Sequence, residues 1–261
     1  MNALLVGVDC ATVDAKVGLA LAEYTYGKVS LKAATLCSRE RSAANTVVEW
    51  LSNSTEPALL AIDAPLGWPL ALARSLARHR AGQKIDTEPD EMFRRATDRF
   101  IKKQLSKTPL DVGADRIART AHAALRLLGE VRRRLDIPIP LAWNSAFDGI
   151  SAIEVYPAAT LVAYGFQSTG YKAPAQVGGR REVLASLSSL IQVGRIAAVL
   201  ELSADALDAA VCVLAAKDFL DGSALSPPDR GLAAQEGWIW APPLQPGVKP
   251  KTRNKSTRGE F

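Results

Sequence analysis

The chain has 261 residues, of which 48% are hydrophobic, a mean hydropathy of +0.03 and a formal net charge of +5. This length and composition allow a sizeable buried core in one domain and exclude a disordered chain. The sequence has no apolar run long enough to span a bilayer and no N-terminal signal with a cleavage site, so we expect a cytoplasmic protein with no membrane partner.

Three cysteines, Cys10, Cys37 and Cys212, lie far apart in the sequence and form no Cys-x-x-Cys pair. An odd number at distant positions argues against both a disulfide framework and a zinc knuckle. We therefore expect reduced thiols.

The charge is distributed unevenly along the chain. Residues 71–140 carry +7, from 16 Lys and Arg against 9 Asp and Glu, and residues 244–261 carry +4, which leaves −6 for the remainder. An acidic core with two basic segments fits a cation-binding centre that acts on a polyanion. Charge runs on amphipathic helices are also common as solvated faces, and charge by itself favours that simpler interpretation.

The first stretch, residues 3–9, is an apolar run of strand length that ends on Asp9. Such a run predicts a strand buried on both faces at the centre of a sheet. Residues 16–24 and 28–36 flank the short Gly-containing loop 25–27, which predicts a hairpin. Three antiparallel strands are therefore expected to open the chain.

A predicted helix and a fourth predicted strand follow. Residues 41–52 have apolar residues at helical spacing, and residues 58–62 form another buried strand that ends in Asp63. Ligands of open α/β sheets bind beyond the strand ends, so Asp9 and Asp63 are well placed for chemistry. For Asp9 alone, a turn residue that caps its own backbone is an equally reasonable interpretation.

Residues 68–140 are predicted to form a basic helical insertion after the fourth strand, with helices that begin near 68–69, 87–89 and 114. Prolines and acids near the first turns are normal helix start signals. On the second helix Arg95, Arg99 and Lys103 recur every fourth residue. This row could face the phosphates of a substrate or pair internally, with Asp98 for example.

Two further segments contribute acids. Residues 151–156 resume the strand pattern and contain Glu154, and residues 203–220 predict a helix with Ser203 as its N-cap. Asp205 and Asp208 lie on one side of this helix. The helix dipole explains an acid in the first turn, at about 0.3–1 kcal/mol, but Asp208 lies beyond that turn.

After Gly222 the chain is Pro-rich, with one expected short strand or ordered loop at 237–240. Residues 243–261 lack apolar periodicity and are predicted to form a flexible basic tail. The predicted organisation is therefore a single domain over residues 1–242, which includes the insertion, and the tail.

Five short motifs follow one another along the chain: Gly7-Val8-Asp9, Ile62-Asp63-Ala64-Pro65-Leu66-Gly67, Arg95-Ala96-Thr97-Asp98-Arg99, Glu154-Val155-Tyr156-Pro157 and Asp205-Ala206-Leu207-Asp208-Ala209-Ala210. Together they resemble an uncharacterised family of predicted RNase H-like nucleases, known as domain of unknown function 429. The order of the acids also resembles the Holliday-junction resolvase branch of the RNase H-like superfamily. The resemblance implies an α/β fold: an RNase H-like mixed sheet of three antiparallel and then parallel strands, flanked by helices, with the helical insertion after the fourth strand.

The resemblance implies a nuclease that hydrolyses phosphodiester bonds of DNA or RNA with two Mg²⁺ or Mn²⁺ ions, roughly 4 Å apart. Carboxylates suit these hard cations. We assign Asp9 as the bridging ligand, Asp63 and Asp208 as ligands of separate ions, and Asp205 as a further ligand or an adjacent base. Glu154 is included as a catalytic acid, although it could instead orient a basic side chain.

Three residues complete the predicted site as substrate-binding groups: Arg95, Arg99 and Lys103. Arg95 and Asp98 could reach the site or pair with each other.

Two other functions fit parts of the sequence. Residues 9–12 vaguely resemble the first phosphate loop of sugar kinases and actin-like ATPases, which share the strand order. That loop needs Gly, whereas this chain has Cys10 and Ala11, and those proteins use two copies of the fold. The other alternative is a non-catalytic nucleic-acid-binding module in which the basic segments carry the function.

Overall fold

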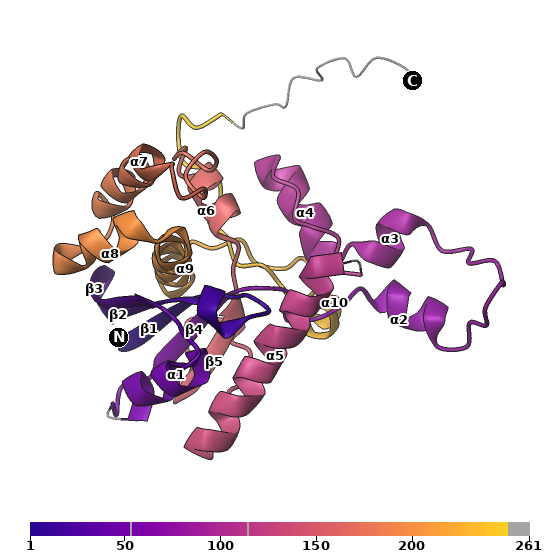
Figure 1. The fold of residues 1–261 in the computed structure, drawn as a ribbon. Helices are drawn as coiled ribbons and strands as arrows, with labels where there is room; N and C mark the ends of the chain where they lie inside the picture. Colours follow the sequence, from indigo (N-terminus) through magenta and orange to yellow (C-terminus); the bar gives the residue numbers. More distant parts are fainter. Residues whose placement is uncertain (53, 114, 250–261) are drawn as a thin grey trace.

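The computed structural model describes residues 1–52, 54–113 and 115–249. At its centre is a five-stranded sheet in the order β3-β2-β1-β4-β5 (Figure 1). β1 pairs antiparallel with β2, β2 antiparallel with β3, and β1-β4-β5 are parallel. The predicted fold class, a mixed sheet flanked by helices, is confirmed. The strands are β1 (Asn2–Asp9), β2 (Gly18–Thr25), β3 (Lys28–Leu36), β4 (Ala58–Asp63) and β5 (Ile150–Glu154).

The central strands are apolar throughout because both of their faces are covered. Successive side chains of a strand point to opposite faces. Leu5 in β1 therefore packs into one hydrophobic cluster and Val6 into another, and Leu59 and Leu60 of β4 divide in the same way. The protein is thus a three-layer structure with helices on both faces of the sheet (Figure 1).

The helix α9 (Ala204–Leu220) covers one face and is buried along almost its whole length. It lies unusually close to the sheet. A Cβ atom on Gly7 would sit only 1.9 Å from the carbonyl oxygen of Ala209. A Cβ atom on Gly18 would sit 2.1 Å from the carbonyl oxygen of Asp205. Glycine at these two positions is what permits the contact. The helices α6 (Pro157–Ala163), α7 (Val177–Ser188) and α8 (Ala197–Leu202) pack around α9.

The other face is covered by α1 (Ala43–Ser52) and α5 (Asp115–Leu135). The helix α5 lies inside the predicted insertion, yet Ala124, Leu128 and Val131 are buried in the core of this face. α5 is therefore part of the main structure rather than an appendage. The short helices α2 (Leu70–Leu76) and α3 (Pro89–Phe93) and the loop between them extend away from the sheet (Figure 1).

The second helix of the predicted insertion is not continuous. It divides into α3 and α4 (Ala96–Leu105), and the intervening Arg94 and Arg95 have extended backbone conformations. Arg95 is the N-cap of α4, and its backbone N–H donates to Asp98 in a capping box. The predicted row Arg95, Arg99, Lys103 was therefore wrong, because Arg95 precedes the helix that carries the other two.

The C-terminal segment is more ordered than predicted over its first residues. After α10 (Arg230–Glu236), Trp240 donates its backbone N–H to the carbonyl of Glu154, so residues 237–240 are the expected ordered loop beside β5. Gln245 then donates to the carbonyl of Ala163, which places the start of the predicted flexible tail against α6. Residues 250–261 of that tail lie outside the described residues. β5 ends at Glu154, which was predicted inside a longer strand.

None of the helices in the described ranges is both long and apolar enough to cross a membrane.

Asp218 of α9 is a buried acid away from the predicted site, and it generates a pH prediction. One of its oxygens accepts a 2.6 Å hydrogen bond from the Tyr164 hydroxyl, and among the described residues the other has no partner. Burial raises the pKa of Asp218 to about 7, although the bond from Tyr164 opposes the shift. The folded state therefore holds this proton more tightly than the unfolded chain, whose Asp pKa is about 3.9. This difference makes stability fall as the pH rises from about 4 to about 7.

We expect Asp218→Asn to gain stability relative to wild type as the pH rises from about 5 to about 8, because the variant has no carboxyl to ionise. Urea unfolding across this range measures the difference. Tyr164→Phe keeps the acid and should keep the decline. Parallel profiles for wild type and Asp218→Asn would contradict the assignment.

Candidate functional site: a carboxylate cluster at the strand ends

Two of the predicted acids are neighbours on adjacent strands. Asp9 is the last residue of β1 and Asp63 the last of β4, and the parallel register pairs them directly. By strand alternation, Asp9 lies on the same face as Leu5 and Gly7, and Asp63 on the same face as Leu59. Both acids therefore lie on the face covered by α9.

The other two acids come from the N-terminal part of α9. The Ser203 hydroxyl accepts the backbone N–H of Ala206 and so fixes where this helix begins, as its sequence predicts. The contact of the helix with Gly18 then holds Asp205 beside the end of the hairpin. Asp208, one turn further along, is 1% exposed. The same close packing thus brings α9 and its two acids to the ends of β1 and β4.

These four carboxyl groups interact electrostatically. Burial, Asp208 and Asp63 together raise the pKa of Asp9 well above its ordinary value. Burial and Asp208 raise the pKa of Asp63 to about 7. Burial and Asp208 also raise the pKa of Asp205. Like charges that are partly withdrawn from water disfavour ionisation, so the cluster is a site that attracts positive charge.

A positive charge is supplied by Lys172, which sequence reasoning missed. Its Nζ lies 2.6 Å from Oδ2 of Asp208, and the hydroxyl of the fully buried Tyr171 donates a 2.7 Å hydrogen bond to Oδ1. Lys172 also lowers the pKa of Asp9 and Asp63, against the effects that raise them. The Lys172 side chain is 62% exposed, so the charge reaches the cluster from the solvent side.

The loop that carries Lys172 is fixed by a buried arginine. Arg180 of α7 donates to the carbonyls of Tyr171, Ala173 and Pro174, and to that of Glu201. These four carbonyls satisfy a guanidinium that is 2% exposed. The packing of α7 and α8 therefore sets the position of Tyr171 and Lys172, which lie 37 and 36 residues before Asp208 in the sequence.

The donor set fits a hard divalent cation in its chemistry, because all four groups are carboxylates. Their present arrangement is not that of a formed metal site. Within residues 1–52, 54–113 and 115–249, no three His, Cys, Asp or Glu side chains are placed to hold a metal ion. Lys172 neutralises Asp208 in this arrangement.

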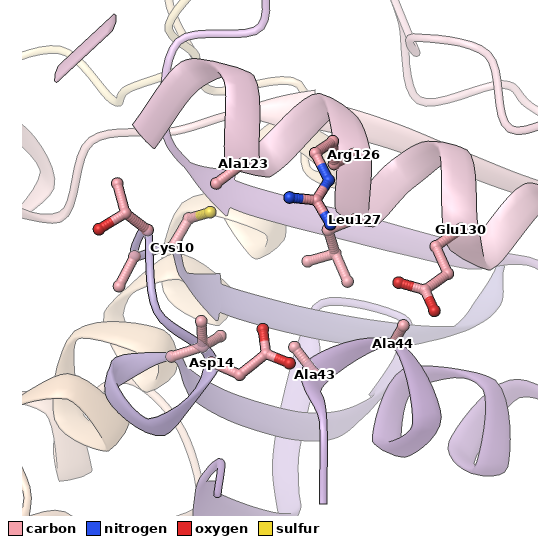
Figure 2. A pocket seen from close by; sticks show the side chains of 11 residues that line it. Cys10, Asp14, Ala43, Ala44, Ala123, Arg126, Leu127 and Glu130 are labelled. Atoms are coloured by element: carbon pink, nitrogen blue, oxygen red, sulfur yellow. The ribbon is translucent and has the colours of Figure 1, made fainter. Parts of the chain in front are cut away.

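On the other side of β1, the chain that leaves Asp9 borders a small cavity of about 100 Å³ (Figure 2). It lies between the segment that follows β1, the start of α1 and the middle of α5. Its lining includes Cys10, Thr12 and Asp14 from the first of these and Arg126 and Glu130 from α5. Burial and then the nearby Asp63 and Asp9 raise the pKa of Cys10 to about 12, so its thiol is protonated at neutral pH.

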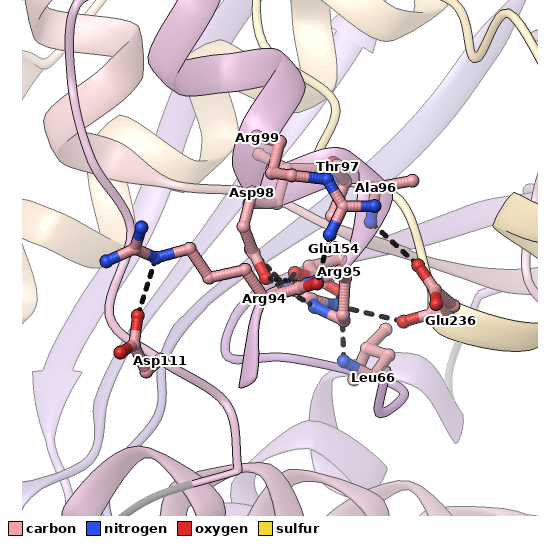
Figure 3. A network of polar contacts seen from close by, with 11 residues as sticks. Leu66, Arg94, Arg95, Ala96, Thr97, Asp98, Arg99, Asp111, Glu154 and Glu236 are labelled. Atoms are coloured by element: carbon pink, nitrogen blue, oxygen red, sulfur yellow. Dashed lines mark hydrogen bonds and ion pairs between the residues drawn. The ribbon is translucent and has the colours of Figure 1, made fainter. Parts of the chain in front are cut away.

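Glu154 does not join the carboxylate cluster. In the register of β5 it pairs with Ile62, whose side chain points to the face opposite that of Asp63. Its carboxylate receives Nη1 and Nη2 of Arg95 at 2.7 and 2.6 Å, and the backbone N–H of Leu66 at 2.9 Å (Figure 3). Glu154 thus orients a basic side chain, the second of its two expected roles, and the predicted catalytic role is wrong.

Arg95 is likewise unavailable to a substrate. It is 1% exposed, and Asp98 accepts its Nε and Nη2 at 3.1 and 2.9 Å. The remaining donor contact is to the carbonyl of Glu236, at 3.2 Å. A guanidinium held on every side by buried acceptors cannot contact phosphate, so the predicted substrate contact is wrong for Arg95.

The buried network fixes the loop that follows Asp63. The carboxylate of Glu236, at the end of α10, accepts the backbone N–H of Leu70. It also accepts the backbone N–H of Ala96 (Figure 3). A Cβ atom on Gly67 would sit 2.5 Å from the Glu236 carbonyl oxygen. These contacts join residues 66–70 to the start of α4, the end of β5 and the end of α10, beside the carboxylate cluster.

Of the other predicted substrate contacts, Arg99 is exposed but donates Nη1 to the carbonyls of Arg94 and Asp90. Lys103 is exposed on α4. Neither residue interacts with the carboxylate cluster through any described contact, and their role as substrate contacts stays a prediction.

Sequence reasoning found three of the clustered acids because Asp9 and Asp63 end apolar runs and Asp208 lies beyond the reach of the helix dipole. It found Asp205 because that residue lies three positions before Asp208, on the same side of the helix. It missed Tyr171, Lys172 and Glu236, whose partners lie 36 or more positions away in the sequence. Their local sequence carries no periodic signal that could have identified them.

The buried ion pairs predict a large stability effect for Arg95. Arg95→Met would leave Glu154 and Asp98 buried without their cation, which typically costs about 3–5 kcal/mol. Arg99→Met, an exposed change on the helix that Arg95 caps, should cost no more than about 0.5 kcal/mol. Urea unfolding of both variants measures the difference. Equal stability of Arg95→Met and wild type would refute the network's structural role.

The carboxylate cluster predicts an unusual response of Asp9→Asn. Removal of one repelling charge should raise the melting temperature in chelator. The variant should also gain less than wild type from added Mg²⁺ or Mn²⁺, because a ligand that binds only the folded state stabilises it by RT ln(1 + [L]/Kd). Asp14→Asn, an exposed change in the same segment, is the control. If wild type shows no metal-dependent shift and Asp9→Asn is simply less stable, the acids are structural.

The chain was compared with solved structures, curated proteins and protein families. The chain is similar to a solved structure described as "T. thermophilus RuvC in complex with Holliday junction substrate", with a TM-score of 0.34, 10% sequence identity, and coverage of 82% of this chain and 93% of that chain. No curated protein matches the chain. Residues 7–231 match the family model described as "Protein of unknown function (DUF429)". Because this match spans most of the sequence, the protein belongs to the DUF429 family.

Proposed function

We propose that the protein is a divalent-metal-dependent nuclease that hydrolyses phosphodiester bonds of DNA or RNA. The observation that carries this proposal is the carboxylate cluster formed by Asp9, Asp63, Asp205 and Asp208 at the ends of β1 and β4. Repelling carboxylates destabilise a fold unless a cation joins them. The presence of four such groups beside the ends of β1 and β4 is therefore best explained by a ligand of positive charge.

Asp9, Asp63, Asp205 and Asp208 would hold Mg²⁺ or Mn²⁺. Such ions, when bound, activate a water and stabilise the leaving oxygen of a phosphodiester. The Asp63 carboxyl, with a pKa of about 7, is partly protonated at neutral pH. It would release its proton as a cation binds, since an opposite charge favours the ionised form.

Lys172 would change partner in this scheme. Its ammonium neutralises Asp208 in the cation-free protein, and its exposed side chain leaves it free to turn away. An ammonium displaced to the rim of the cluster would be placed to contact a phosphate oxygen of the substrate. Tyr171 would stay in place, because its hydroxyl and the Arg180 contacts of its loop are buried, and it would orient Asp208.

A second candidate is a nucleic-acid-binding module without hydrolytic activity. Two observations favour this candidate. Among the described residues no three ligands are placed to hold a metal ion, and Asp208 forms an ion pair with Lys172. The two candidates differ in one measurable respect, which is whether bound nucleic acid is cleaved when a divalent cation is added.

We expect Asp63→Asn to lower the divalent-dependent cleavage rate by about 10²-fold or more, since one ligand's contribution to transition-state stabilisation is worth several kcal/mol. Affinity for nucleic acid in chelator should be kept or raised, because a negative charge near the phosphate is removed. Labelled DNA and RNA, with and without chelator, provide the assay.

Asp14→Asn, which changes an exposed acid outside the cluster, should cleave at the wild-type rate. Undiminished cleavage by Asp63→Asn would remove this residue from the site. Binding by wild type without cleavage under any divalent cation would favour the second candidate.

A further inference from the structure

A second, wider hollow lies on the N-terminal half of α5 and has a volume of about 380 Å³. We call it the α5 groove. Its lining residues all belong to α5 except Thr12, which lies three residues after Asp9. The groove is lined by Thr12, Ala118, Arg119, His122, Ala123 and Arg126.

The α5 groove is continuous with the surroundings of the carboxylate cluster. Thr12, Ala123 and Arg126 line both the groove and the smaller cavity beside Cys10 (Figure 2). Cys10 directly follows Asp9, and the charge of Asp9 acts on its thiol. The groove therefore opens at the end of β1, across the strand ends from the acids.

The cations of α5 fall into two groups. Arg132 donates to the carbonyl of Ile139, and Arg134 pairs with Glu130 and Asn45, so both are used to hold the helix against its neighbours. Arg119 and Arg126 are exposed, and in the described part of the chain neither has a hydrogen-bond or ion-pair partner. Arg116 and Arg133 of α5 are likewise exposed and their guanidiniums have no partner among the described residues, but they do not line the groove. Arg119 and Arg126 are therefore the unpartnered arginines of α5 that face the groove.

The lining of the groove contains no carboxylate, whereas that of the smaller cavity contains Asp14 and Glu130. An anion is thus favoured along the groove and disfavoured beyond Arg126. Arg119 and Arg126 are seven positions apart, which is about 10 Å along the helix. Along the axis of a duplex the phosphates of one strand rise about 3.4 Å each, so a duplex aligned with α5 would place about three phosphate steps over this length.

We propose that the α5 groove binds the phosphate backbone of a nucleic acid strand and leads it over the strand ends to the carboxylate cluster. Arg119 and Arg126 are the phosphate contacts, and arginine suits this role because its planar fork of donors matches phosphate oxygens. The groove replaces the Arg95 row as the principal backbone contact. That the bound strand is a substrate rests on the proposed function, whereas its binding does not.

The test is binding of labelled single-stranded and duplex DNA and RNA by fluorescence anisotropy, in chelator, over a range of salt concentrations. We expect Arg119→Gln/Arg126→Gln to weaken binding about tenfold per lost contact near 50 mM salt, where counterion release is strong. The slope of log K against log salt should become shallower by up to about 0.9 per contact on duplex DNA, or about 0.7 on single strands.

Three matched variants make the result specific. Lys28→Gln/Arg195→Gln removes two exposed positive charges in and beside β3, and it should bind like wild type. Arg119→Lys/Arg126→Lys keeps the charge and should keep most of the salt dependence. Arg99→Gln/Lys103→Gln tests the rival surface on α4.

Wild-type binding by Arg119→Gln/Arg126→Gln, or an equal loss in the β3 control, would overturn the groove proposal. A loss confined to Arg99→Gln/Lys103→Gln would overturn it in favour of α4. If the groove variant loses binding while wild type cleaves nothing with any divalent cation, the groove stands and the nuclease proposal fails. If wild type cleaves nucleic acid and Arg119→Gln/Arg126→Gln binds normally, the nuclease proposal stands and the groove proposal fails.

Discussion

The close approach of α9 to the sheet is the constraint on which the site depends. Backbone meets backbone where Gly7 faces Ala209 and where Gly18 faces the carbonyl of Asp205, with no room for a Cβ atom at either glycine. A helix held at this distance cannot slide along the sheet without losing both contacts. The acids of its first two turns are therefore fixed relative to Asp9 and Asp63, and four carboxyl groups from three elements interact electrostatically.

A second set of interactions fixes the loop that leaves the site. Arg95 is buried between Glu154 and Asp98, and the Glu154 carboxylate also receives the backbone N–H of Leu66. Glu236 ties the start of α4 to the start of α2. Buried ion pairs of this kind add little net stability compared with an apolar core but tolerate no missing partner. Their effect here is to hold loop and helix ends in one arrangement next to Asp63.

The two faces of the sheet have different chemistry at the same edge. Strand alternation puts Asp9 and Asp63 on the α9 face, and the α5 groove, with Arg119 and Arg126, lies on the other side of the strand ends. Negative and positive regions are thus separated by the thickness of the sheet and meet at its carboxyl edge. A polyanion bound along the basic side, as we propose, would reach the acidic site at this edge.

The sequence by itself determined the strands, the order of the main elements and the four acids Asp9, Asp63, Asp205 and Asp208. Local physics accounts for most of this, because apolar runs identify buried strands and the acids that end them, and a helical acid beyond the first turn, Asp208, has no local explanation. Asp205 was found through its spacing from Asp208. Only the tertiary structure decided which charges are buried together. Arg95 and Glu154 have the same residue types as groups that bind substrate or metal, yet they satisfy each other. Lys172 reaches Asp208 through a loop that packing alone positions, because ion pairs between distant segments depend on the assembled fold and leave no periodic trace in the chain.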